Sequence, residues 1–167
     1  MKALTALIAT LLALLAPPAF AQEIADIAAQ PDRAQLEQWK ADGVTTVVNM
    51  RTPAEMEELD YDEAEAVRAL GMNYVSIPFD SAAPSPKITE ALGEALDGAE
   101  GKVALHCRSG SRAANALAAL QMERGEADPE TVESPDADLT LLASMLRQLS
   151  PRYREAMSRA DCTGATC

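Results

Sequence analysis

A single thiol lies between a strand-like run and a helix-like run in the stretch VALHCRSGSRAANAL, residues 103–117. Cys107 ends the apolar segment, and Arg112 opens an alanine-rich helical pattern five positions later. The positive end of a helix lowers the pKa of a nearby thiol, so that the thiolate forms and acts as a nucleophile. The planar guanidinium of an arginine can bind two oxygens of a tetrahedral anion. These residue types at this spacing predict covalent chemistry on a small anion.

The residues between the thiol and the arginine form a predicted anion-binding loop. Such a turn can direct consecutive backbone N–H groups into one concavity, and Gly110 relieves crowding where the backbone bends. His106, the only histidine of the chain, is on a buried strand, where a supporting role for the loop is a better assignment than proton transfer. A buried core histidine and an inert buried cysteine are the structural alternatives. The predicted loop residues are Arg108, Ser109, Gly110 and Ser111.

Strand-like and helix-like patterns alternate on both sides of this loop. Strands are predicted at 23–28, 44–50, 72–79 and 102–107, and helices at 31–43, 52–71, 85–98 and 111–125. This alternation predicts one α/β domain, with a mostly parallel central sheet flanked by helices and the active loop between a strand and a helix. After an acidic, proline-broken connector, two more helices are predicted at 139–150 and 151–160. Ligands of such sheets bind beyond the carboxyl ends of the strands, where Cys107 falls.

Residues 1–21 have the pattern of a bacterial secretory signal peptide. Lys2 precedes an apolar run of 14 residues, and Ala19-Phe20-Ala21 has the small-x-small form of a cleavage site. The run is short for a bilayer span, and the alternative is a retained N-terminal anchor. We expect cleavage near Ala21 and a periplasmic or secreted protein, with a catalytic domain at 22–160 and a tail at 161–167.

The tail contains the other two cysteines, Cys162 and Cys167. An oxidising compartment favours a disulfide between them, which would close a short loop and leave Cys107 free. An unpaired tail is the alternative.

The charge balance limits the classes of ligand. There are 14 basic and 26 acidic residues, giving a net charge of −12. This surface repels nucleic acid and anionic lipid, so we expect no nucleic-acid partner and no stable membrane insertion after signal removal. One histidine and scattered carboxylates predict neither a metal site nor a cofactor. The predicted partner is a small anionic or phosphorylated substrate, attracted locally by the loop.

The segment HCRSGSR resembles the signature of the tyrosine and dual-specificity phosphatase superfamily. Over about residues 23–125, the runs WKADGVTTVVNMRTPAE, GMNYVSIPFD and KVALHCRSGSRAANAL resemble the phosphatase-like domain family of beta-lactamase-hydrolase-like proteins. The resemblance implies a phosphatase fold with Cys107 as nucleophile and Arg112 as anion clamp. It also implies a general acid upstream of the thiol. Asp80 is in the corresponding place, 27 residues before Cys107, and a turn residue is its alternative role.

Two features depart from that family pattern. Tyrosine phosphatases place five residues between cysteine and arginine and usually follow the arginine with Ser or Thr, whereas this loop has four and Ala113 follows. Four is the spacing of single-domain rhodaneses. Three hypotheses result: a phosphatase-like hydrolase with a phosphocysteine intermediate, a rhodanese-like sulfurtransferase carrying sulfane sulfur from thiosulfate or a persulfide to a thiol acceptor, and a non-catalytic anion-binding domain. The family resemblance favours the hydrolase.

Overall fold

The computed structural model describes residues 22–127. The signal-like segment, both helices predicted beyond residue 138 and the tail cysteines lie outside this range. The elements, in chain order, are β1 (Ile24–Ala28), α2 (Arg33–Ala41), β2 (Val44–Asn49), α3 (Pro53–Met56), α4 (Glu63–Ala69), β3 (Asn73–Ser76), α5 (Pro86–Asp97), β4 (Lys102–His106) and α6 (Ser111–Arg124).

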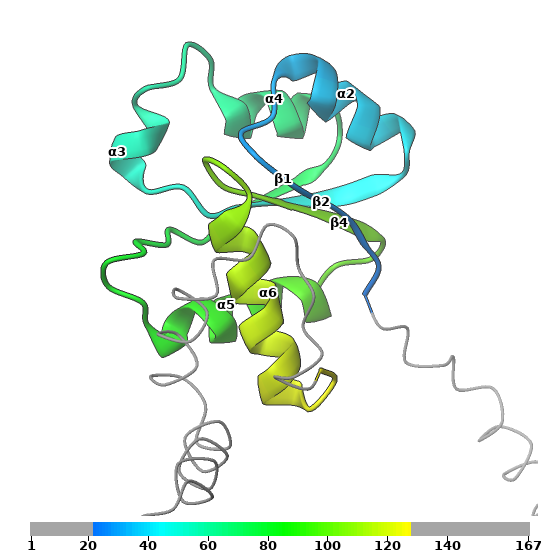
Figure 1. Ribbon diagram of the computed structural model, residues 1–167. Helices are drawn as coiled ribbons and strands as arrows, with labels where there is room; N and C mark the ends of the chain where they lie inside the picture. Colours follow the sequence, from blue (N-terminus) through cyan, green and yellow to red (C-terminus); the bar gives the residue numbers. More distant parts are fainter. Residues whose placement is uncertain (1–21, 128–167) are drawn as a thin grey trace, which may run out of the picture.

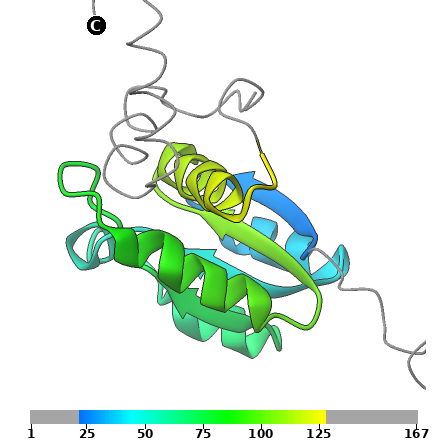
Figure 2. The same ribbon diagram turned by 90° about the horizontal axis from the view of Figure 1, so that it is seen from below.

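The four strands form one parallel sheet in the order β1-β4-β2-β3. Helices α2 and α4 cover one face, and α5 and α6 cover the other (Figure 1). Figure 2 shows α5 and α6 side by side on their face of the sheet. The predicted α/β fold is confirmed. Because all four strands are parallel, their carboxyl ends meet at one edge, where the segments after β2, β3 and β4 come together.

Each face of the sheet has its own apolar core. Along β2, Val47 packs with the α2–α4 layer and Val48 with the α5–α6 layer, as the alternation of a strand requires. The same alternation continues past the end of β4. The ring centroid of His106 lies 6.3 Å from that of Trp39, on the α2 side. Cys107 belongs to the core of the opposite face.

The single helix predicted at 52–71 is wrong, because two short helices occupy this stretch. Thr52 caps α3, and Asp62 begins a second helix with its carboxylate accepting from the N–H of Glu65 at 2.8 Å. Asp and Thr side chains compete for backbone N–H groups and so favour helix starts over helix interiors. The helical periodicity of the sequence concealed this break.

The strand predicted at 72–79 is shorter in the structure and ends at Ser76. Beyond it, Pro78 has no N–H to give to a ladder, so the chain leaves the regular sheet. The N–H of Phe79 still donates to Met50 O at 3.3 Å. This contact keeps the segment after β3 beside the segment after β2.

No helix within residues 22–127 combines the length and apolarity needed to cross a bilayer.

Candidate active site

The predicted loop joins β4 to α6 at the carboxyl edge of the sheet. Cys107 is 1% exposed, and its sulfur accepts a hydrogen bond from the N–H of Gly110 at 3.2 Å. Gly110 has φ of +91° and ψ of −32°, a conformation that side chains other than glycine rarely adopt. The glycine therefore turns the chain so that its N–H faces the sulfur and α6 can begin at the next residue.

The environment of Cys107 favours the thiolate. Burial raises the pKa of the thiol, but hydrogen bonds from the backbone at Ala113, Ser109 and Arg112 and the charge of Arg112 outweigh burial, so the pKa is lowered. The N–H groups that lower the pKa of Cys107 thus belong to the predicted anion-binding loop and the first turn of α6.

Two other segments hold Arg112, which is buried in the first turn of α6. Its Nη1 donates to the main-chain oxygen of Phe79 at 2.5 Å. Its Nη2 donates to both carboxylate oxygens of Glu55, at 2.7 and 2.8 Å. Nε of Arg112 has no hydrogen-bond partner among residues 22–127. These three hydrogen bonds fix the guanidinium plane, and of its five N–H groups Nε–H and at least one other are left for a ligand.

Glu55 is a site residue that the sequence reading missed. It comes from α3, where its Oε2 also accepts from the N–H of Thr52 at 2.8 Å in a capping box. Burial raises the pKa of Glu55, but the hydrogen bonds from Thr52 and Arg112 and the charge of Arg112 lower it overall. The Thr-x-x-Glu spacing was visible as a helix-start signal. The contact with Arg112, 57 residues away, was not.

Arg51 supports α3 and is not exposed at the rim of the site. It is 4% exposed, with Nη1 donating to Gln30 Oε1 at 2.7 Å and Nη2 donating to the main-chain oxygen of Glu55. Arg51 therefore hydrogen-bonds the backbone of Glu55, and the side chain of Glu55 in turn hydrogen-bonds Arg112.

Asp80 lies next to Phe79, the residue bonded to Arg112, so the structure brings this segment to the same edge as the loop. Its side chain is exposed, and its Oδ1 accepts from the N–H of Ala82 at 2.9 Å. This bond is typical of a turn residue, which is the alternative role that the sequence indicated for Asp80. The second carboxylate oxygen has no hydrogen bond to a described residue.

Backbone contacts join the remaining loop residues to the segment that follows β1. Arg108 and Ser109 are exposed, and Ser111 is half-buried. The main-chain oxygen of Arg108 accepts from the N–H of Gln30 at 3.4 Å, and Ser109 forms an antiparallel bridge with Ala29. The loop is thus braced by β1, while its thiol and its arginine contact other elements.

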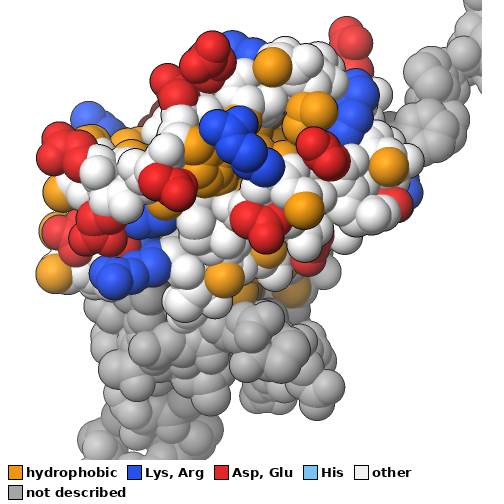
Figure 3. All heavy atoms as spheres, turned by 90° about the horizontal axis from the view of Figure 1, so that it is seen from above, with side chains coloured by type: hydrophobic (Ala, Val, Ile, Leu, Met, Phe, Trp, Pro, Cys, Tyr) orange, Lys and Arg blue, Asp and Glu red, His pale blue; other side chains and the backbone are white. Residues whose placement is uncertain are grey.

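The charges around this edge are mostly negative. Red side chains gather on the left of Figure 3, the end at which α3 lies in Figure 1, and the exposed residues after α3 include Glu57, Glu58 and Asp60. Within residues 22–127, no group of three or more His, Cys, Asp or Glu side chains could hold a metal ion. The loop itself offers positive groups to an anion, namely Arg112, the exposed Arg108 and the loop N–H groups.

The fold and the loop define an α/β domain of the phosphatase-like class. Residues 19–123 match the model of the family described as "Beta-lactamase hydrolase-like protein, phosphatase-like domain". The chain belongs to this family, as the sequence resemblance implied. Comparison with curated protein sequences gave no significant match.

Solved structures agree with this assignment. The chain is similar to a candidate phosphatase from Shewanella putrefaciens CN-32, with 26% identity over 74% of this chain and 87% of the other, and a TM-score of 0.57. TpbA of P. aeruginosa shares the fold, with 18% identity, coverage of 78% and 83%, and a TM-score of 0.54. A cysteine-to-serine variant of TpbA was solved in complex with pTyr, at 16% identity, coverage of 78% and 83%, and a TM-score of 0.55.

Proposed function

We propose that the protein is a cysteine-dependent phosphatase that hydrolyses a phosphate ester through a phosphocysteine intermediate. Its family and fold support a phosphatase function. The observation that carries the proposal is the single loop in which N–H groups and Arg112 lower the pKa of Cys107. The same groups suit the oxygens of a phosphoryl group, because donors placed in advance around developing negative charge stabilise a transition state.

The reaction has two displacement steps. The Cys107 thiolate attacks phosphorus, the bond from phosphorus to the ester oxygen breaks, and Asp80 gives its proton to the departing oxygen. Water then attacks the phosphocysteine, the sulfur–phosphorus bond breaks, and Asp80 takes the proton from water. The products are an alcohol or phenol and inorganic phosphate, and the thiolate is regenerated. Arg112 holds two oxygens of the phosphoryl group in both steps.

We place this activity outside the cytoplasm, in a bacterial periplasm or secreted. The proposal rests on the signal-like residues 1–21 and on the pairing expected for Cys162 with Cys167. Mass mapping of periplasmic protein without reductant should find these two cysteines joined and Cys107 alkylatable. A bond from Cys107 to either tail cysteine would contradict this assignment.

A rhodanese-like sulfurtransferase is the second candidate, favoured by the four-residue spacing between Cys107 and Arg112. In that reaction the thiolate attacks the sulfane sulfur of thiosulfate, the sulfur–sulfur bond breaks, and sulfite leaves with the bonding pair. The resulting Cys107 persulfide passes its outer sulfur to an acceptor such as cyanide. No acid is needed, because sulfite is a stable anion.

One paired assay separates the two reactions. The full chain is given an aryl phosphate in one arm and thiosulfate with cyanide in the other. We expect phosphate release, and we expect Cys107→Ser to lower it by about 10⁴-fold or more because the attacking atom is lost. Thiocyanate formation without phosphate release would overturn the phosphatase proposal in favour of the sulfurtransferase. Phosphate release that survives Cys107→Ser would exclude the thiol mechanism.

Asp80→Asn tests the acid. A positioned general acid contributes ~10²–10⁴-fold when the leaving oxygen is a poor leaving group. We expect the variant to lose that factor with alkyl phosphates and much less with aryl phosphates, while thiosulfate turnover stays within about a few-fold. Equal rates for variant and wild type on alkyl phosphates would show that Asp80 is only the turn residue bonded to Ala82.

A further inference from the structure

The arginine that directly follows Cys107 carries a charge that no described residue neutralises. Arg108 is exposed, and its side chain makes no hydrogen bond, ion pair or ring contact with any residue of the range 22–127. Every other arginine of that range contacts a carboxylate or an aromatic ring. These pairs are Arg112 with Glu55, Arg124 with Asp97, Arg51 with Glu58, Arg33 over Tyr61 and Arg68 over Tyr74. Arg108 is thus the exception in a chain rich in carboxylates.

The backbone of Arg108 is held in place although its side chain is not. Its main-chain oxygen accepts from the N–H of Gln30 at 3.4 Å. The next residue, Ser109, forms the antiparallel bridge with Ala29. The guanidinium is therefore carried from a fixed point of the loop, and only its side-chain torsions decide where the charge lies.

The place of Arg108 in the loop sets which part of a substrate it can reach. Consecutive Cα atoms are about 3.8 Å apart, so this side chain starts beside that of the nucleophile. Cys107 is buried, however, and so is Arg112, whose guanidinium is fixed within the site. A phosphoryl group on the sulfur would meet Arg112 and the loop N–H groups. The exposed charge of Arg108 then remains for a part of the substrate outside the phosphoryl group.

An exposed guanidinium beside a phosphoryl site is complementary to a second oxyanion. A carboxylate or a second phosphoryl group presents two oxygens to the planar fork of an arginine. The net charge of −12 and the exposed acidic residues after α3 repel a substrate more strongly for each negative charge that it carries. A second anionic group is therefore favourable only where a nearby cation offsets this repulsion, and Arg108 supplies that cation.

We propose that Arg108 is a specificity-determining residue, which selects phosphate esters that carry a second anionic group close to the ester. The recognised chemistry is an oxyanion, supplied by a carboxylate or by a second phosphoryl group. Arg112 remains the clamp of the reacting phosphoryl group, and Arg108 contacts a group that does not react. This inference rests on the proposed phosphatase function and names its class of substrate.

A matched pair of substrates tests the selection with the full chain. Meta-carboxyphenyl phosphate carries the second negative charge, and meta-carbamoylphenyl phosphate has nearly the same shape without it. The ratio of their kcat/KM values should fall about fivefold in Arg108→Gln, the effect of one exposed charge-assisted contact. Comparing this ratio between variants cancels the difference between the two leaving groups. About 0.5 M salt should bring the wild-type ratio towards that of the variant.

Two further variants separate the position of the charge from its presence. Arg108→Lys keeps the charge without the planar fork and should retain part of the wild-type ratio. Arg124→Gln is the matched control, because it removes an exposed arginine charge at the opposite edge of the sheet. Its ratio should equal that of the wild type. Substitution of an exposed side chain should leave the thermal melt of each variant nearly unchanged.

A second test measures binding without turnover. Phosphonoacetate, its neutral amide and methylenediphosphonate each compete with iodoacetamide for Cys107, and mass spectrometry identifies the alkylated residue. In the wild type, the two compounds with a second anionic group should protect the thiol at lower concentration than the amide. Whichever of the two protects better identifies the second group as a carboxylate or a phosphoryl group. Arg108→Gln should lose most of the difference from the amide.

The two tests distinguish failure of this inference from failure of the proposed function. Phosphate release from both substrates with equal ratios in the wild type and Arg108→Gln would overturn the role of Arg108 alone. Absence of phosphate release, with protection still dependent on Arg108 and the second anionic group, would overturn the phosphatase function and leave the anion selection standing. Equal protection of the wild type by phosphonoacetate, methylenediphosphonate and the amide would overturn the inference.

Discussion

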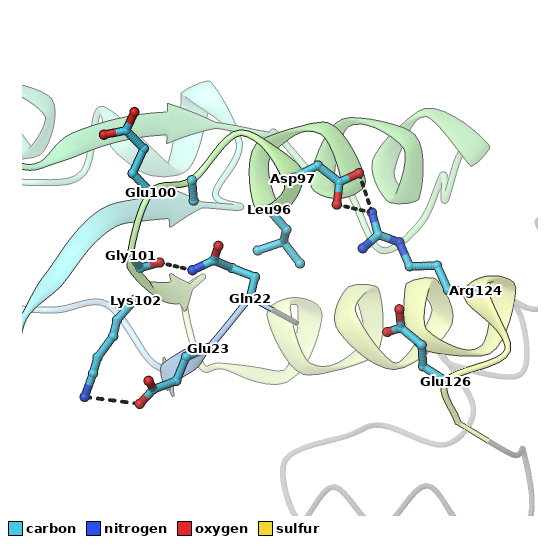
Figure 4. Close-up of a pocket in the computed structure, with 10 residues that line it drawn as sticks. Gln22, Glu23, Leu96, Asp97, Glu100, Gly101, Lys102, Arg124 and Glu126 are labelled. Atoms are coloured by element: carbon cyan, nitrogen blue, oxygen red, sulfur yellow. Dashed lines mark hydrogen bonds and ion pairs between the residues drawn. The ribbon is translucent and has the colours of Figure 1, made fainter. Parts of the chain in front are cut away.

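Helix α6 carries an arginine at each end, and the two pair with carboxylates in nearly the same way in different surroundings. Arg112 bonds both oxygens of Glu55 at 2.7 and 2.8 Å, with 11% and 18% of the two side chains exposed. Arg124 bonds both oxygens of Asp97 at 2.9 and 2.8 Å, with 31% and 68% exposed (Figure 4). Arg124 borders a cavity of about 720 Å³ at the opposite edge of the sheet from the active loop.

The helix dipole separates the roles of the two arginines. A positive side chain at the C-terminus of a helix is stabilised by the dipole, whereas one at the N-terminus is opposed by it. Arg124 therefore follows the rule for stability. Arg112 breaks that rule, and half-buried Glu55 compensates its charge. A local choice that opposes stability and is compensated elsewhere is typical of a functional position.

The glycines at the two ends of α6 also differ, one in a conformation common at helix ends and the other beside the thiol. Gly125 ends α6 with φ of 72° and ψ of 23°, the ordinary left-handed conformation of a helix C-terminus. Gly110 precedes α6 with φ of +91° and makes no side-chain cap, but its N–H faces the sulfur of Cys107.

The largest difference is expected between two conservative substitutions. Arg112→Lys should lower phosphatase kcat/KM by about 10³-fold, because a lysine cannot hold two oxygens of the phosphoryl group. Arg124→Lys should leave kcat/KM within about twofold, since an exposed pair contributes little. Steady-state kinetics on an aryl phosphate measure both. Similar losses in the two variants would mean that burial and helix end do not distinguish these arginines.

Alanine at the two glycines should give the next largest contrast. Gly110→Ala forces the turn out of its conformation and moves one N–H away from the sulfur, so turnover should fall about 10²-fold. Gly125→Ala retains a conformation that alanine tolerates, at a cost of about 1 kcal/mol in the free energy of unfolding and with unchanged kcat. Urea titration with parallel assays separates the effects. Full activity in Gly110→Ala would show that this N–H is not part of the anion-binding loop.

Removing the charge of Glu55 or of Asp97 tests whether each carboxylate compensates the charge of its arginine. Glu55→Gln loosens the Arg112 guanidinium and should lower kcat/KM about tenfold, whereas Asp97→Asn should not. Because the folded state lowers the pKa of Glu55 from 4.5, its carboxylate adds stability above that pH and loses it as the pH falls through the lowered value. Thermal melts from pH 6 to pH 3 should show a shallower acid loss in Glu55→Gln. An unchanged slope would mean that the folded and unfolded values coincide.

The smallest effect is expected from the exposed pair of Arg124 and Asp97 alone. Arg124→Ala removes a partly exposed ion pair that solvent screens, so the free energy of unfolding should change by less than about 1 kcal/mol. Urea denaturation measures the change, and about 0.5 M salt should reduce it further. A loss several times larger would show that the pair by the cavity is a structural anchor.

Local patterns were sufficient for the elements on either side of Cys107. The apolar run of β4, the glycine and the alanine-rich start of α6 predicted the strand, loop and helix around Cys107, because each pattern depends on neighbours in sequence. The same reasoning failed at 52–71, where periodicity was continuous but the side chains of Thr52 and Asp62 each begin a separate helix.

The acidic stretch in that region shows where the sequence stops being informative. Seven acidic residues lie from position 55 to position 65, and nothing in their order distinguishes them. The structure buries Glu63 against His106 and directs Glu55 to Arg112, while Glu57, Glu58 and Asp60 stay exposed.

The sequence by itself was enough to predict Cys107, Arg112 and the loop that joins them as a site, since all of these lie within six consecutive residues. Only the tertiary structure decided which carboxylates contact Arg112 and His106. That choice follows from the strand order β1-β4-β2-β3, which places the segment after β2 beside the loop after β4. Parallel strands can be ordered in several ways with the same hydrophobic pattern, so burial and partner choice for Glu55 and Glu63 are set by which elements become neighbours.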